Sequence, residues 1–318
     1  MAVLQKIDNP YGLIQTVEHL ESCSVYRSQD STGDCEITVY PVFSGIELVY
    51  YDVHMQTCDL EPTKGREMLI ITHCQEGRIE FEYKNGEFLY LAAGDLSIQK
   101  NTDNIRHRYC PLNHYHGVSV AIDMKRVPRC FSCILEDVFV NPQELEMKFC
   151  SEKPYTIMRE NISMEHIFSE LYSVPENIRK GYHKVKVLEL LLFLSGMEYK
   201  GEAEERKYFS RSQVMAAKQA KELLTSNLEE HITISELAER LDISPTSLKI
   251  CFKGVYGDTI NSYITGYKMQ KAASLLKNTD KSVLEIAGMV GYNNGSKFAG
   301  AFKKVMSKAP NEYRKSIV

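Results

Sequence analysis

Clustered histidines are the first residues of this chain that could do chemistry, because neutral imidazole binds divalent metals. His107, His114 and His116 lie within ten residues, and the last two form an HxH pair. A catalytic metal at such a pair needs a glutamate within about five residues and a later histidine. Residues 117–122 contain no glutamate, and the next histidine, His166, falls in a helical part of the sequence. The pattern therefore predicts no metal.

Cysteines and cofactor motifs suggest little further chemistry. The nine cysteines lack the spacing of a disulfide framework, which favours free thiols in a reducing cytoplasm. Cys130 and Cys133 form a CxxC without a second pair, so zinc or redox chemistry is only the minor alternative there. The sequence shows no nucleophile motif, phosphate loop or dinucleotide fingerprint. It also shows no signal peptide and no membrane span. We expect no catalytic residue and no cofactor.

The last third of the chain contains an internal repeat, in which residues 236–238 (ELA) recur 49 residues later as 285–287 (EIA). Phe252-Lys253 recurs as Phe302-Lys303 after one inserted residue. Each copy is about the size of one helix-turn-helix unit.

Helix-start signals mark the same places in both copies. Capping boxes open the first helix of each copy at residues 233–236 and 282–285. The next helix of the first copy starts at Ser244-Pro245, an N-cap followed by proline. In the second copy Gly291 occupies the turn, and Asn293 or Asn294 can cap.

Each second helix carries one apolar stripe at i, i+4 spacing, formed by Leu248 and Phe252 and by Phe298 and Phe302. The opposite stripe is free to enter a DNA major groove. A connecting helix over residues 260–276 spans about 25 Å and could hold the two units near one DNA turn apart, about 34 Å.

The charge distribution agrees with a nucleic-acid-binding tail. From Gln213 to the end there are 15 basic and 10 acidic residues, a net charge of +5, whereas the rest of the chain has a net charge of −9. A basic module on an acidic body is typical of a chain with one DNA-binding part.

Residues 212–315 resemble the AraC/XylS family of bacterial transcription regulators. The matching motifs are Ile234-Ser235-Glu236-Leu237-Ala238, Ser244-x3-Leu248-x3-Phe252-Lys253, Gly257, Ala272-x2-Leu275-Leu276, Glu285-Ile286-Ala287-x2-Val290-Gly291-Tyr292, Phe298-x3-Phe302-Lys303-Lys304 and Pro310-x2-Tyr313-Arg314. Two positions depart from the family: Ile250 replaces the usual arginine, and residues 307–310 (SKAP) lack the usual glycine.

The resemblance implies double-stranded DNA as partner, with recognition helices at Pro245–Tyr256 and Gly295–Met306. The DNA-contacting candidates it implies are Thr246, Ser247, Lys249, Ile250, Lys253, Gly295, Ser296, Lys297, Gly300, Lys303 and Lys304.

Before the tail, short alternating segments with turn signals, such as residues 67–74, 78–83 and 88–91 around Asn85-Gly86, predict a sandwich or jelly-roll barrel. The resemblance implies a cupin-like barrel that binds an unidentified small-molecule effector. Candidate ligand-contacting residues are Tyr50, His73, Phe81, Tyr83 and Tyr90.

Helices are predicted at residues 163–171 and 181–199. The second is apolar on two faces, one with Val185, Leu188, Leu191 and Leu192 and the other with Val187, Leu190 and Leu194. One face can pack within its own domain. The other either pairs with a second subunit or is covered by the same chain.

We expect an α+β protein with a cupin-like domain at residues 1–138, a helical dimerisation segment at 139–200, a linker at 201–211 and a double helix-turn-helix domain at 212–318. The predicted function is a cytoplasmic, homodimeric, effector-responsive transcription regulator, an activator by family habit, with RNA polymerase as a further candidate partner. The alternatives are a regulator whose first domain only dimerises and a metal-dependent cupin enzyme.

Overall fold

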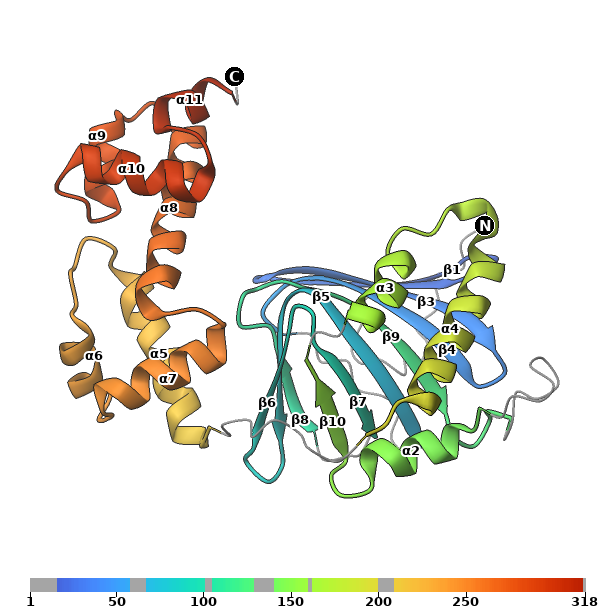
Figure 1. Ribbon diagram of the computed structural model, residues 1–318. Coiled ribbons are helices and arrows are strands. Elements are labelled where there is room, and N and C mark those ends of the chain that lie inside the picture. The colour runs from blue at the N-terminus through green and yellow to red at the C-terminus, as the bar shows by residue number, and fades with distance from the viewer. Residues whose placement is uncertain are drawn as a thin grey trace. The chain divides into compact units, whose positions relative to one another are not determined.

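The computed structural model describes residues 16–57, 67–100, 105–128, 140–159, 162–199 and 209–316. The chain forms two compact units, residues 1–208 and 209–318, which are drawn together in Figure 1. Their boundary falls inside the predicted linker, while the functional division of the chain stays a prediction. Cys130 and Cys133 lie outside the described residues. No helix of the described ranges has the length and apolar character needed to cross a membrane.

The N-terminal unit is built on an antiparallel sheet, as the alternating segments predicted. Its strands are β1 (Thr16–His19), β2 (Ser24–Asp30), β3 (Gly33–Phe43), β4 (Ile46–His54), β5 (Met68–Tyr83), β6 (Phe88–Ala92), β7 (Leu96–Lys100), β8 (Ile105–Tyr109), β9 (Tyr115–Asp123) and β10 (Tyr155–Met158). The spatial order is β1-β2-β3-β4-β9-β5-β7-β10.

Strand β5 is one long strand where the sequence suggested two. Its first half pairs with β7 and β9, and its second half pairs with β6 and β8. Within the described part of the chain no pairing joins β1 to β10, so the region is an antiparallel sheet and closure into a barrel stays a prediction.

Helices cover one face of this sheet, as Figure 1 shows for α3 and α4. They are α2 (Pro142–Cys150), α3 (Ile162–Leu171), the 3-10 turn η1 (Glu176–Ile178) and α4 (Arg179–Gly196). Strand residues such as Leu48 and Val118 pack against these helices, whereas Val49 and Val53 point into a second core on the opposite face.

Helix α4 buries Val187, Leu190, Leu191 and Leu194. Leu191 therefore belongs to the buried face, contrary to our assignment of it to the other face. The reason is that the sheet contacts a broad stripe of the helix, wider than one i, i+3, i+4 row. Val185 and Leu192 remain exposed.

The C-terminal unit is entirely helical in its described part. Its helices are α5 (Arg211–Ser226), α6 (Ile234–Arg240), α7 (Pro245–Tyr256), α8 (Ile260–Asn278), α9 (Val283–Met289), α10 (Gly295–Met306) and α11 (Pro310–Lys315). Helices α7 and α10 have the bounds predicted for the recognition helices. Helix α8 packs against α7 on one side of the repeat and against α9, α10 and α11 on the other.

Candidate nucleic-acid interface

The first helix-turn-helix unit consists of α6 and α7, and side-chain caps fix where each begins. The Glu236 amide donates to the Thr233 hydroxyl at 3.3 Å, and the Thr233 amide donates to the Glu236 carboxylate at 2.8 Å. At the start of α7 the Ser244 hydroxyl accepts from the Ser247 amide at 3.2 Å, ahead of Pro245 at the first helical position. These caps satisfy amides that have no partner within the helix, so both helix starts are locally determined.

The second unit, α9 and α10, repeats this construction. Ser282 and Glu285 form the same reciprocal box, with distances of 3.2 and 2.7 Å. The Asn294 side chain accepts from the Lys297 amide at 2.9 Å, so Asn294 and not Asn293 is the cap of α10. Both predicted capping boxes are therefore confirmed.

Aromatic packing shows that the two copies are also equivalent in their cores. The rings of Phe252 and Tyr263 meet edge to face at 5.5 Å and 78°, and those of Phe302 and Tyr313 meet at 5.5 Å and 81°. Each pair holds a second helix against the helix that follows it. The buried face of each recognition helix is therefore packed against the helix that follows it, and the opposite face is left free for DNA.

Capping at the ends of these helices explains one departure from the family pattern. Gly257 ends α7 in the left-handed region at φ 82°, where glycine is unstrained. Ser307 takes the equivalent left-handed position at φ 63° after α10. The second copy therefore keeps the backbone geometry of the first without its glycine.

The exposed sides of α7 and α10 carry the predicted DNA contacts. Leu248, Phe252, Phe298 and Phe302 are fully buried. Nine of the eleven candidates are exposed to solvent: Gly300 and the eight residues Thr246, Lys249, Ile250, Lys253, Ser296, Lys297, Lys303 and Lys304. Gly300 lies between Lys297 and the last turn of α10.

Two candidates are less accessible. Ser247 is half-buried, and its hydroxyl accepts from the Gln213 amide nitrogen of α5 at 3.5 Å. Gly295 is half-buried too, and a β-carbon there would meet Leu284 of α9. Both lie near the N-terminal end of a recognition helix, Ser247 against α5 and Gly295 against α9.

The electrostatics of this face are set by unpaired cations. Across the described residues, none of Lys249, Lys253, Lys297, Lys303 and Lys304 has a carboxylate within ion-pair distance. Ile250 is 40% exposed beside Lys249, so an apolar side chain stands where the family usually has arginine. Such a face can donate to phosphates and base edges and can touch a thymine methyl group.

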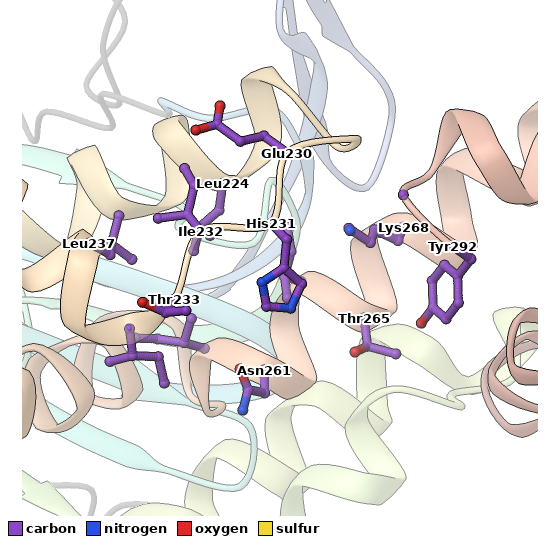
Figure 2. A pocket seen from close by; sticks show the side chains of 14 residues that line it. Leu224, Glu230, His231, Ile232, Thr233, Leu237, Asn261, Thr265, Lys268 and Tyr292 are labelled. Atoms are coloured by element: carbon purple, nitrogen blue, oxygen red, sulfur yellow. The ribbon is translucent and has the colours of Figure 1, made fainter. Parts of the chain in front are cut away.

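A pocket of about 570 Å³ in the same unit lies apart from this face. The loop before α6, the first half of α8 and the turn before α10 line it, and Figure 2 shows His231, Lys268 and Tyr292 around it. The Lys268 ammonium lies 5.9 Å from the centre of the Tyr292 ring, and burial lowers the pKa of this lysine. None of the eleven candidates lines the pocket, so it is separate from the predicted DNA contacts.

The five effector candidates of the N-terminal unit fall into different environments. The Tyr50 hydroxyl donates to the Leu171 carbonyl at 2.8 Å, and His73 stacks on Phe168 of α3 with ring centres 4.5 Å apart. Both thus contact the helix-covered face. Phe81 and Tyr83 belong to the opposite core. The Tyr90 hydroxyl donates to Glu80 at 2.7 Å. The structure does not bring the five residues together at one site.

The HxH pair does not converge with His107. The rings of His114 and His116 are perpendicular with centres 6.4 Å apart, and His114 Nδ1 lies 3.1 Å from the Leu112 carbonyl. His107 lies on β8 opposite Glu82.

Sequence reasoning missed two helices of the C-terminal unit. Helix α5 opens with a capping box between Ser210 and Gln213, a signal visible in the sequence. Helix α11 positions Arg314, whose guanidinium donates to the carbonyls of Leu276 and Lys281. This arginine joins α11 to the C-terminal end of α8 and to the segment before α9.

Two capped helix-turn-helix units joined by one long helix define a DNA-binding domain. The chain matches a helix-turn-helix domain family (HTH_18) over residues 237–316. The C-terminal unit is an AraC-family DNA-binding domain.

Similar proteins share this region. The melibiose operon regulatory protein of Escherichia coli is 32% identical over 92 residues, 29% of this chain and 30% of that protein. The xylose operon regulatory protein of Escherichia coli is 37% identical over 83 residues, which are 26% of this chain and 21% of that protein. The match thus covers less than a third of these relatives. The solved C-terminal domain of AraT, a response regulator from Geobacillus stearothermophilus, is 33% identical, with a TM-score of 0.31 over 32% of this chain and 84% of that domain.

Proposed function

We propose that this chain is a sequence-specific transcription regulator that binds double-stranded DNA through α7 and α10. The observation that supports this best is the pair of equivalently capped helix-turn-helix units, each with a buried aromatic stripe and a free basic face. An enzymatic role has no comparable support. The relatives named above are regulators, which favours the same role here.

In this role the exposed side chains make different kinds of contact with DNA. Lys249 and Lys297, near the start of each recognition helix, donate to guanine edges or to phosphates. Thr246 and Ser296 hydrogen-bond to bases or backbone. Lys253, Lys303 and Lys304 lie further along the helices and bind phosphates. Two such helices on one chain read successive major-groove segments on one face of the duplex.

The N-terminal unit dimerises in this proposal. Val185 and Leu192 of α4 are spaced seven residues apart, Ile178 precedes Val185 by seven residues at the end of η1, and the three are exposed at 60%, 44% and 48%. A seven-residue apolar repeat on a helix is typical of a helix–helix interface. The stripe therefore favours pairing with α4 of a second copy over coverage by the same chain.

Effector binding by the N-terminal unit would alter how the two DNA-binding domains are presented. We expect the regulator to activate transcription, by contact with RNA polymerase. The alternative is a regulator whose N-terminal unit only dimerises. Because the five effector candidates do not lie at one site, a test for effector binding has to include the whole N-terminal unit.

Selection of duplexes from a random pool by the full chain tests the DNA-binding role. We expect enriched sites with two conserved segments about 10 base pairs apart and an affinity that falls steeply with salt. Failure to bind any duplex at low ionic strength would contradict the DNA-binding role.

Thermal denaturation of the protein with each member of a metabolite panel tests effector binding, because a ligand of the folded state raises the melting temperature. If no metabolite raises it, dimerisation is left as the role of the N-terminal unit.

A further inference from the structure

Strands β4 and β9 bring together three side chains that have no part in the role proposed above. The Asp52 carboxylate oxygen Oδ1 lies 2.9 Å from Nε2 of His54 and 3.1 Å from Nε2 of His116. One ligand atom from each residue lies within 4.8 Å of the other two. We propose that Asp52, His54 and His116 form a binding site for a divalent transition-metal ion of the zinc class.

Strand geometry explains why these residues meet. Asp52 and His54 are two apart on β4, so their side chains share a face of the sheet. The antiparallel register places Asp52 directly opposite His116 of β9, although the two are 64 residues apart in sequence. Because all three ligands stand on paired strands, the arrangement does not depend on loop conformation.

The distances suit a single bound ion. Zinc lies about 2.0–2.2 Å from nitrogen and oxygen ligands in tetrahedral sites, so ligand atoms on one zinc are about 3.3 Å apart. The two separations from the Asp52 oxygen, 2.9 and 3.1 Å, need only a few tenths of an ångström of adjustment, and the two imidazole nitrogens lie within 4.8 Å of each other. Two imidazoles and one carboxylate are a ligand set of zinc and other first-row metals, with a position left for water.

Simple hydrogen bonding accounts less well for the cluster. His116 Nε2 has no solvent-exposed surface and no hydrogen-bond partner, even though Asp52 is near. The two imidazole rings are perpendicular, with centres 5.0 Å apart, so they do not stack on each other. Both nitrogens approach the same carboxylate oxygen, so the three ligand atoms are close enough to converge on one ion.

The neighbouring charges favour a cation. Glu76 of β5 lies opposite His116 in the register, and Glu36 of β3 lies opposite Asp52. Arg27 partly neutralises Glu36 through an ion pair at 2.7 Å. A carboxylate ligand with a second acidic residue nearby offsets the positive charge of a divalent ion. Metal binding here is independent of the DNA-binding role, and the proposal departs from our sequence-based expectation of no metal.

Calorimetric titration of tag-free, chelator-treated full-length protein with Zn²⁺ tests the site. We expect one equivalent to bind, with the affinity reduced at least about ten-fold in Asp52→Asn, His54→Gln and His116→Gln. The side chains of Asp52 and His54 are 59% and 51% exposed, so these two substitutions leave the fold intact. Circular dichroism of each variant checks this.

Two controls address other zinc ligands. His107→Gln removes a histidine outside the cluster, and Cys130→Ser with Cys133→Ser removes the CxxC; both should bind like the parent. Cobalt(II) absorbance in the visible region gives a second readout, which should be lost in His116→Gln. Equal zinc affinity of the parent and all three cluster variants, or no saturable binding by the parent, would overturn the site.

Discussion

Gly291, in the turn of the second helix-turn-helix unit, lies against the carbonyl oxygen of Leu228, in the segment between α5 and α6. A β-carbon on Gly291 would overlap this oxygen, and the backbone there is left-handed at φ 76°. The contact joins the second unit to the segment that leads into the first. The two recognition helices are therefore linked through this turn as well as through α8.

Substitution of Gly291 by alanine should destabilise the C-terminal unit by at least about 1–2 kcal/mol, since a left-handed alanine is strained and the clash adds to the strain. Urea unfolding followed by circular dichroism measures the loss. Gly288→Ala is the matched control, because Gly288 lies in α9 with open space around its α-carbon. Equal stability of the two variants would show that the turn can shift away from Leu228.

The local features of the C-terminal unit could be predicted because they depend on residues close in sequence. The caps at Thr233, Ser244 and Ser282 join residues three apart, and the bounds of α7 and α10 follow from them. Helix α5 was missed although its cap, Ser210, gives the same kind of signal.

The N-terminal unit was less predictable because its arrangement rests on contacts between distant segments. The sequence pattern did not pair β4 with β9, and only their register reveals that Asp52 faces His116. The effector candidates were chosen by residue type alone. Tyr50 and Phe81 then proved to lie in cores on opposite faces of the sheet.

Replacing Lys249 or Lys297 by alanine should weaken binding of a selected DNA site by about 1–3 kcal/mol if the lysine reads a base, with relaxed preference at one position. Fluorescence anisotropy on a set of single-base site variants measures this. Uniform weakening on every sequence, with a smaller salt slope, would instead assign that lysine to a phosphate. Lys277→Ala, on an exposed position of α8 outside the predicted contacts, is the control.

Acidification should destabilise the N-terminal unit through two buried histidines. Burial lowers the pKa of His73 and of His183 to about 4, and Arg179 adds to the effect on His183. Because the unfolded value is about 6.5, the stabilisation is complete above that pH and is lost as the pH falls from 6.5 toward 4. We expect the free energy of unfolding to drop by roughly 1–3 kcal/mol between pH 7.5 and 5.5.

Hydrogen exchange of peptides from β4 and β5 at both pH values localises this loss to the N-terminal unit. The double variant His73→Gln, His183→Gln should flatten the pH dependence, whereas His107→Gln, at an exposed position on β8, should leave it unchanged. A double variant with the parent's pH dependence would assign the effect to other groups.

Charged substitutions on the exposed stripe of α4 should dissociate the proposed dimer. Val185→Glu and Leu192→Glu each place a charge in an apolar helix–helix contact, where an unpaired charge is strongly unfavourable. Light scattering coupled to size exclusion measures the mass. Met147→Glu on α2, where the side chain is 63% exposed, should change nothing. A parent chain that is monomeric at micromolar concentration would exclude this interface.

Substitution of Gly300 by alanine should affect the stability of α10 and its binding to DNA in opposite directions. Gly300 lies inside α10 on the exposed side, and a β-carbon there would meet nothing within 4 Å of the protein. Gly300→Ala should therefore raise the free energy of unfolding by about 0.5–1 kcal/mol, the usual gain of alanine over glycine in a helix.

The same substitution should lower affinity for a selected DNA site by about ten-fold, or 1.4 kcal/mol, if the backbone of α10 approaches the duplex closely at this point. Gly266→Ala, in α8 with equally open surroundings, should gain stability without losing affinity. A Gly300→Ala variant that is more stable and binds DNA as tightly as the parent would show that α10 meets DNA through the side chains around Gly300 and not at its backbone.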